Sequence, residues 1–181
     1  MHEGLKILLG ATVGDAGARM LHWIYNPKKL KRPTGTLMTN PKKLLRDIFG
    51  FDQFRPGQSE IIDAVVDKQN VLAIMPTGGG KSLCFQLPAL MGEGLTVVIS
   101  PLIALMRDQV RGLQAAGVAA EAITSANTEE ETDKIFSALN ASKLRILYLA
   151  PERLASTAMQ SALHRYNVVS FVVDEAHCVS Q

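Results

Sequence analysis

A glycine-rich segment followed by a lysine and a serine is the part of the sequence best suited to chemistry. Residues 71–75 form a short apolar run, and residues 76–82 follow it as Pro-Thr-Gly-Gly-Gly-Lys-Ser. Consecutive glycines let a backbone fold tightly, so that several N–H groups and the positive end of a following helix point at one anion. A buried strand, a glycine turn and a helix start therefore predict a phosphate-binding loop.

The side chains of this loop suit a nucleotide that carries Mg²⁺. Lys81 supplies a point charge for the β and γ phosphates, and the Ser82 hydroxyl is the expected magnesium ligand. The backbone contacts would come from Thr77, Gly78, Gly79 and Gly80. The general pattern GxxxxGK[ST] has glycine where this chain has Met75, so the strict motif fails at its first position. An ordinary flexible turn is the alternative, but the strand before the glycines and the Lys-Ser after them favour phosphate binding.

Two adjacent carboxylates follow a second apolar run. Residues 168–173 are mostly Val and Phe, and they lead into Asp174 and Glu175. Ligand sites of α/β proteins lie at the carboxyl ends of strands. Asp174 would hold Mg²⁺ directly or through water, and Glu175 would orient and deprotonate an attacking water. A simple polar strand end is the alternative, but the phosphate loop about 90 residues earlier favours the catalytic interpretation.

Apolar runs alternate with helix-period segments and thereby predict an α/β fold, a parallel sheet with helices on both faces. The expected strands are residues 71–75, 96–100, 119–123, 144–150 and 168–174. The expected helices between them are residues 81–91, 102–115, 129–139 and 155–165, with two amphipathic helices upstream at 41–49 and 58–67.

Composition indicates an intracellular soluble protein. The 181 residues are 47% hydrophobic and 20% charged, and no apolar run is long enough for a signal peptide or a membrane span. Cys84 and Cys178 have neither metal-ligand spacing nor a disulfide pattern. The net charge of +2 gives mild support for a nucleic-acid partner. A basic cluster within residues 28–46 could face phosphates, although a solvated linker is favoured.

Five segments in order resemble the motifs of RecQ-family ATP-dependent DNA helicases of superfamily 2. They are FRPGQ at residues 54–58, MPTGGGKSLCFQLPA at 75–89, SPLIALMRDQ at 100–109, YLAPERL at 148–154 and DEAHCVSQ at 174–181. The resemblance covers residues 41–181 and is closest to bacterial members. It implies a RecA-like (P-loop) first motor domain, with ATP and Mg²⁺ as cofactors. Superfamily 2 helicases use a loop variant without the first glycine, in agreement with Met75.

The resemblance also implies residues that bind the base. Gln58 matches the glutamine that reads the adenine edge, and an amide has both the donor and the acceptor for this. Phe51 and Arg55 match the groups that flank the base, because aromatic and guanidinium planes stack on adenine. Core packing is the alternative for Phe51 and Phe54, and for Phe54 it is the expected role.

DNA is the partner that the resemblance implies, as a single-stranded tail and a duplex junction. Loops that track the phosphates of one strand would contain Ser100, Pro101, Thr124, Ser125 and Arg153, and His177 would couple hydrolysis to DNA occupancy. The family tends to have Asn-Ser-Thr where this chain has Thr-Ser-Ala at residues 124–126. A surface ion pair is an equal alternative for Arg153, and a structural hydrogen bond is one for His177.

The resemblance further predicts that the motor is incomplete. The aromatic-rich loop after residues 174–177 and the second motor domain, with its arginine finger, would lie beyond Gln181. The strand between the phosphate-loop strand and the Asp174–Glu175 strand comes later in the family, so the sheet is expected to lack a central member and to be marginally stable. We expect residues 41–181 to be a partial RecA-like domain and residues 1–40 to be an extension or linker.

Residues 14–25 are similar to a short stretch of ADP-ribosylglycohydrolase-like proteins, but the acidic metal clusters of that family are missing, so no such activity is inferred. The leading hypothesis is the N-terminal part of a 3′ to 5′ DNA helicase that couples ATP hydrolysis to unwinding in recombination and repair, in the cytoplasm at the bacterial nucleoid. The alternative is a catalytically inactive nucleotide-binding fragment.

Overall fold

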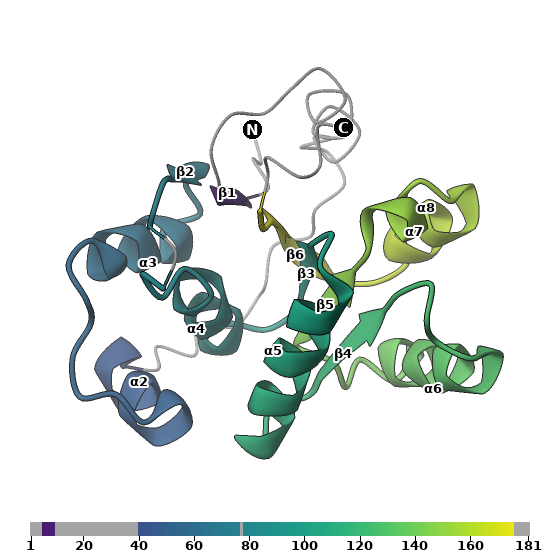
Figure 1. The fold of residues 1–181 in the computed structure, drawn as a ribbon, viewed down its shortest axis with the longest axis horizontal. Helices are drawn as coiled ribbons and strands as arrows, with labels where there is room; N and C mark the ends of the chain where they lie inside the picture. The colour runs from purple at the N-terminus through teal and green to yellow at the C-terminus, as the bar shows by residue number, and fades with distance from the viewer. Residues whose placement is uncertain (1–4, 10–39, 77, 176–181) are drawn as a thin grey trace.

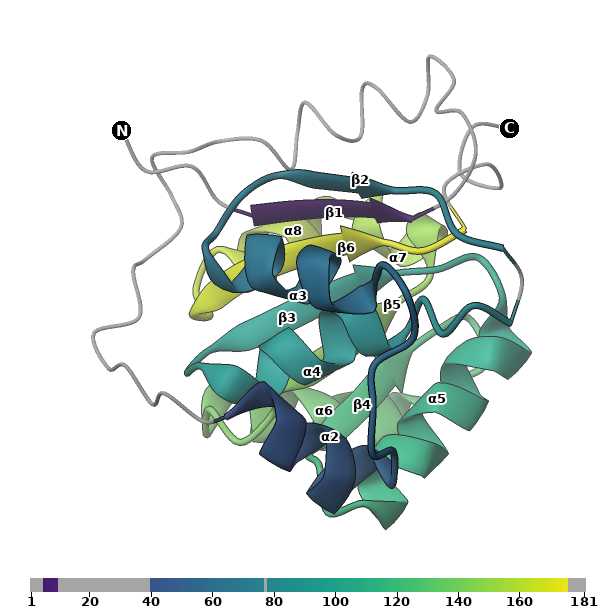
Figure 2. The same cartoon turned by 90° about the vertical axis from the view of Figure 1, so that its left-hand side faces the viewer.

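The computed structural model describes residues 40–76 and 78–175 with their side chains and residues 5–9 as a backbone strand. Within these residues six strands form one parallel sheet in the order β2-β1-β6-β3-β5-β4 (Figure 2). The strands are β1 (Leu5–Leu9), β2 (Val71–Ala73), β3 (Leu95–Ile99), β4 (Ala120–Ile123), β5 (Ile146–Leu149) and β6 (Val168–Val173).

Helices cover both faces of the sheet (Figure 1), as the α/β pattern predicts. One face carries α3 (Gln58–Val66), α4 (Leu83–Met91) and α5 (Ile103–Ala115), and α2 (Pro41–Phe49) packs outside α3 and α4. The other face carries α6 (Glu129–Asn140), α7 (Pro151–Leu154) and α8 (Thr157–Leu163). Alternate residues of β6 point into the two cores, Val172 into the first and Phe171 into the second. Two hydrophobic cores therefore hold the sheet from either side.

The expected gap in the centre of the sheet is absent, so that prediction is wrong. β1 lies between β2 and β6, and Ile7 is in register with both Val71 and Val172. Unpaired backbone N–H and C=O groups in a sheet are costly, and β1 satisfies those that β2 and β6 present to each other. The strand comes from residues 5–9, which the sequence patterns do not predict as a strand.

Helices α4 and α8 begin later than expected. α4 begins at Leu83, so Lys81 and Ser82 stay in the preceding turn. The helix expected at residues 155–165 is found as the shorter α8, and the additional helix α7 precedes it. Pro151 begins α7 at a first-turn position, where a missing N–H costs nothing. Among the described residues no helix combines the length and the apolar character that crossing a bilayer requires.

Candidate functional site

The phosphate loop connects β2 to α4 and has a backbone that only glycine adopts easily. Gly78 and Gly80 have φ values of 76° and 78°, and the Gly79 N–H donates to the Pro76 carbonyl at 3.0 Å. A Cβ on Gly79 would lie 2.9 Å from the Pro76 oxygen, and one on Gly80 would overlap Gln58 Nε2. The loop is therefore a closely packed turn. Thr77 lies outside the described residues.

Gln58 and Arg55 hold the loop from the side of α3. Gln58 is 3% exposed, and its Nε2 donates to the carbonyl oxygens of Gly80 at 3.0 Å and Gly79 at 3.5 Å. Its Oε1 accepts the backbone N–H of Arg55 at 2.8 Å, and Arg55 Nη1 donates to the Gly78 carbonyl. Two of the three residues predicted to bind the base, Arg55 and Gln58, thus also fix the loop.

The two phenylalanines beside Gln58 differ in exposure. Phe51 is 53% exposed, which leaves its ring accessible for stacking. Phe54 is partly buried against a cluster that contains Leu45, Ile62 and Leu87, the packing role expected for it. The adenine-binding role of Phe51, Arg55 and Gln58 stays a prediction.

Lys81 and the acidic pair converge from opposite sides of β1. Lys81 Nζ lies 3.3 Å from Glu175 Oε1, and both side chains are mostly buried. Asp174 is 6% exposed, and its N–H donates to the Ile99 carbonyl at 2.9 Å. Glu175 has a φ of 53° and donates its N–H to Asp174 Oδ1 at 3.0 Å. This turn out of β6 brings both carboxylates to the edge that carries the phosphate loop.

The electrostatics around Asp174 suit a cation. Burial raises the pKa of Asp174, and the charge of Glu175 raises it further, while the Glu175 N–H and Lys81 act in the opposite direction. A buried carboxylate whose charge is disfavoured gains stability from a divalent ion. Ser82 stands at the start of α4 and makes no side-chain capping hydrogen bond. A carboxylate, a hydroxyl and a lysine around a glycine cradle fit a magnesium-bound phosphate.

A second group of predicted residues lies at the carboxyl ends of β3 and β4. Ser100 is 1% exposed, and its hydroxyl is buried without a hydrogen-bond partner among the described groups. Thr124 is also 1% exposed, and its hydroxyl donates to Asn127 Oδ1 at 2.9 Å and accepts the Ala126 N–H at 3.1 Å. Thr124 thus organises its own loop, while Ser125 is exposed and Pro101 is partly buried.

Two arginines fix the loop at residues 124–127. Arg153 donates from Nε and Nη2 to the Thr124 carbonyl at 3.1 and 2.8 Å, and Arg107 Nη2 donates to the Ala126 carbonyl at 3.4 Å. Within the described part of the chain Arg153 binds the Thr124 carbonyl and no ion pair to Arg153 is found, and its DNA-contact and ion-pair roles both stay predictions. Sequence reasoning missed Arg107 and Asn127, although Arg107 lies inside the segment 100–109. His177 lies outside the described residues.

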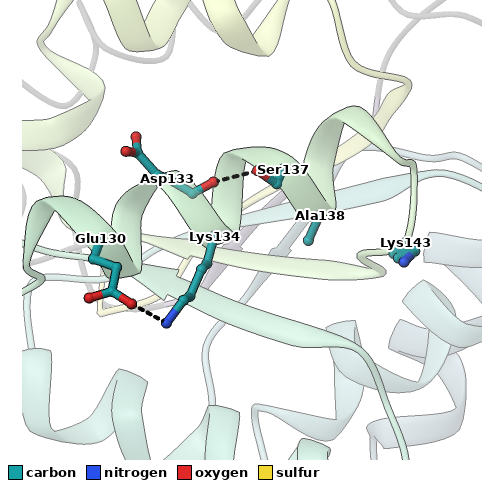
Figure 3. Close-up of a pocket in the computed structure, with 6 residues that line it drawn as sticks. All are labelled: Glu130, Asp133, Lys134, Ser137, Ala138 and Lys143. Carbon is teal, nitrogen blue, oxygen red and sulfur yellow. Dashed lines mark hydrogen bonds and ion pairs between the residues drawn. The ribbon is translucent and has the colours of Figure 1, made fainter.

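A shallow depression along α6 is separate from these groups (Figure 3). Its lining contains the exposed ion pair between Lys134 and Glu130 at 2.6 Å, one helical turn apart. Such pairs contribute little stability and form no chemical centre. The depression shares no residue with the phosphate loop or with Asp174 and Glu175.

Comparison with known proteins places these features in one family. The family model of DEAD/DEAH box helicases matches residues 55–181. The ATP-dependent DNA helicase RecQ of Haemophilus influenzae is 41% identical over 154 residues, which are 85% of this chain and 24% of that protein. RecQ of Bacillus subtilis is 44% identical over 146 residues, which are 80% of this chain and 25% of that protein. The resemblance to RecQ helicases is confirmed.

A eukaryotic relative and a solved structure agree. The rat ATP-dependent DNA helicase Q1 is 40% identical over 147 residues, which are 77% of this chain and 24% of that protein. The crystal structure of the DUF1998 helicase MrfA bound to DNA aligns with a TM-score of 0.59 at 14% identity, over 81% of this chain and 26% of that one. The structural likeness confirms the fold. The chain spans about a quarter of the length of the curated relatives it matches.

Proposed function

Because the chain belongs to the DEAD/DEAH box helicase family, we propose that it forms the first ATP-binding unit of a RecQ-type DNA helicase that moves 3′ to 5′. The observation that carries this proposal is the 3.3 Å approach of Lys81 to Glu175, which brings the phosphate loop and the acidic pair to one point. Either motif alone has a simple structural explanation. Their convergence at the carboxyl edge of a parallel sheet is the arrangement that nucleotide hydrolysis needs.

Each residue has a distinct task at the phosphates. The N–H groups of Gly78 and Gly80 and the start of α4 would surround the β and γ phosphates. The Gly79 N–H keeps the turn closed through the Pro76 carbonyl. Lys81 would neutralise the phosphate charge. Ser82 and Asp174 would hold Mg²⁺, which supplies charge neutralisation when bound. Glu175 would accept a proton from the attacking water.

The ion pair between Lys81 and Glu175 could regulate hydrolysis at this site. A γ phosphate carries more negative charge than one carboxylate, so it competes with Glu175 for Lys81. With Lys81 on the phosphate, the Glu175 carboxylate would turn to the attacking water and accept its proton. Hydrolysis would thus be activated by the presence of the third phosphate.

Base recognition would use the side of α3. Phe51 and Arg55 would flank the adenine, and Gln58 would read its edge, with Thr77 completing the loop. Since Gln58 and Arg55 already bind the carbonyls of residues 78–80, a base at this position would be sensed directly by the phosphate loop.

DNA binding would use the loops at the ends of β3, β4 and β5. Ser100, Pro101, Thr124, Ser125 and Arg153 are the proposed phosphate contacts, with His177 as the coupling residue. Arg107 joins them because its guanidinium holds the same loop as Arg153. The partner is a single-stranded tail at a duplex junction, the location is the bacterial cytoplasm at the nucleoid, and unwinding requires a second motor domain with an arginine finger.

Calorimetric titration with Mg-ATP tests the nucleotide site. We expect saturable binding by the wild type and at least about a hundredfold weaker binding by Lys81→Ala. Lys134→Ala is the matched control, because Lys134 forms an exposed pair with Glu130 away from the site. Thermal unfolding establishes that all three proteins are folded.

The possible results separate the two functions. A folded wild type that binds no nucleotide, or a Lys81→Ala variant that binds normally, contradicts the proposed site. Binding without any DNA-stimulated hydrolysis would support the alternative of a nucleotide-binding fragment. If GTP competed with equal affinity, only the proposed reading of the adenine edge by Gln58 would be contradicted, and the phosphate site would stand.

A further inference from the structure

β2 is an edge strand, and within the described residues its only neighbour in the sheet is β1. Val71, Leu72 and Ala73 are in register with Ile7, Leu8 and Leu9. The phosphate loop follows β2 directly. Among the described strands, the one that carries the loop is therefore joined to the rest of the sheet through residues 5–9 alone.

The other side of β1 is paired with β6 without interruption. Four consecutive residues of β1, from Leu5 to Leu8, are in register with residues 170–173 of β6. Asp174 follows this paired segment directly. β1 is therefore the shared neighbour of the two strands whose carboxyl ends carry Lys81 and the acidic pair (Figure 2).

The spacing of the sheet makes this position important for geometry. Neighbouring strands lie about 4.8 Å apart, so β1 keeps β2 and β6 roughly 10 Å apart. Lys81 and Glu175 meet at 3.3 Å across that separation. Without β1, β2 could pair directly with β6, but the phosphate loop would then shift by a whole strand spacing. If β2 kept its place instead, it would have no hydrogen-bonded neighbour among the described strands.

The composition of the segment suits a central parallel strand. Residues 5–9 read Leu-Lys-Ile-Leu-Leu, and strands inside parallel sheets have nearly continuous runs of such residues. Phe171 and Val172 of β6 and Val71 of β2 contribute to the cores on the two faces of the sheet at the same level. The segment thus meets the requirements of the position that it occupies.

We propose that residues 5–9 are a positioning strand of the nucleotide site, which sets the distance between the phosphate loop and the Asp174–Glu175 pair. This assigns a function to the N-terminal segment, which has no part in the helicase motifs. The strand acts through the backbone and does not contact the nucleotide. Its effect on nucleotide binding rests on the proposed function, whereas its place in the sheet can be tested without any nucleotide.

Disulfide trapping in the full chain tests the placement. Ile7→Cys combined with Val172→Cys joins register partners, whereas Ile7→Cys combined with Val168→Cys lies four residues out of register, about 13 Å away. Both pairs are made in a background with Cys84→Ala and Cys178→Ser. A disulfide needs Cα atoms about 4.4–6.8 Å apart, so we expect the first pair to form at least about tenfold faster under mild oxidation.

A proline substitution tests the consequence for the site. Ile7→Pro removes a backbone N–H from the middle of β1, while Ile7→Val keeps strand propensity and serves as the matched control. We expect faster hydrogen exchange at residues 71–73 and about tenfold or more weaker Mg-ATP binding in Ile7→Pro. Ile7→Val should match the wild type in both measurements.

The two experiments test the placement of β1 and its positioning role separately. Equal disulfide rates for the two cysteine pairs overturn the placement of β1, and this readout decides the matter if Ile7→Pro does not fold. Equal nucleotide affinity of folded Ile7→Pro and Ile7→Val overturns the positioning role. Selective disulfide formation in a protein that binds no nucleotide would support the strand while contradicting the proposed function.

Discussion

The two halves of the sheet, β3-β5-β4 and β2-β1-β6, differ in how their side chains are buried. In β3 and β5 every residue is buried, and the polar groups at the end of β4 are satisfied by Asn127 and Arg153. At the other side β2 has only three residues and Leu72 is 64% exposed. The buried polar groups nearby include Asp174, Gln58 and Ser170. One half is a conventional hydrophobic core, whereas the other ends in the short edge strand β2 beside the candidate site.

This difference shows where stability and chemistry come from. Burying aliphatic side chains stabilises the fold by about 1.5–3 kcal/mol each, whereas a buried carboxylate lowers stability unless a partner compensates. The buried strands β3, β5 and β6 therefore stabilise the domain, whereas the polar groups at the carboxyl ends of β2 and β6 would gain stability from a bound ligand. Substitutions in the two halves should differ in both size and sign.

The largest loss of stability is expected in the packed half. Leu147 lies in the middle of β5 and is fully buried. Leu147→Ala should lower the free energy of unfolding by about 2–5 kcal/mol, because it removes transfer energy and leaves a cavity. Urea denaturation measures this loss. Leu102→Ala is the control, since Leu102 is 47% exposed, and a similar loss in both variants would contradict the distinction between the halves.

A smaller loss of stability with a larger loss of binding is expected at the phosphate loop. Gly80→Ala places a Cβ at a φ of 78° and against Gln58 Nε2, which should cost about 1–2 kcal/mol of stability and weaken Mg-ATP binding more than about tenfold. Thermal unfolding and calorimetry measure the two effects.

The matched control for Gly80 is Gly112, which lies inside α5 with open space where a Cβ would be. Gly112→Ala should stabilise the protein by about 0.5–1 kcal/mol and leave binding unchanged. If Gly80→Ala behaved like Gly112→Ala, the close contact between the loop and Gln58 would be absent in solution.

At Asp174 the sign should reverse. The pKa of Asp174 is raised in the folded protein above its ordinary value of 3.8, so the folded state binds more protons than the unfolded state just above that pH. The contribution of this group to stability is fully present below pH 3.8 and is lost as the pH rises through the raised pKa. Asp174→Asn removes that loss.

We therefore expect Asp174→Asn to have a higher free energy of unfolding than the wild type at neutral pH and to lose magnesium-dependent nucleotide binding. The advantage should shrink as the pH falls toward 4. Thermal unfolding as a function of pH measures it. Asp133→Asn, at an exposed position on α6, is the control and should show no such trend.

The smallest effect is expected on the outer face of β2. Leu72 and Ile74 are 64% and 75% exposed. Leu72→Ser should change the free energy of unfolding by no more than about 0.5 kcal/mol, because little apolar area is removed from a packed environment. Chemical denaturation beside the Leu147→Ala variant measures this. A loss above about 2 kcal/mol would show that the face is covered in solution.

The strands that the sequence predicts correctly are those whose signal is local. Val168–Val173 and Leu95–Ile99 are continuous apolar runs, and such runs are typical of buried parallel strands whatever their neighbours. Leu5–Leu9 is also mostly apolar, and like the other strands it pairs with distant residues, but nothing in its local sequence encodes which partners it takes. The resemblance assigned its position to a later segment, so it was missed.

The site shows the same division between local and distant information. Lys81, Asp174 and Glu175 were predicted because their residue types and strand-end positions carry the chemistry, and the structure brings Lys81 and Glu175 together. The grip of Gln58 on the loop and of Arg153 on Thr124 was not predicted. Both use backbone carbonyls as acceptors, and every residue has one, so no sequence pattern marks them.

The pairing of β1 with β6 also has a consequence for the rate at which the sheet can assemble. Ile7 and Val172 are partners although they lie about 165 residues apart in the chain. Contacts at such separation form slowly, because a long loop must be closed before any stabilisation is gained. The β3-β5-β4 core can collapse early, whereas β2 can join the sheet only after β1 has paired with β6. Nucleotide-binding competence should therefore appear in a late kinetic phase, after most of the helical signal has formed.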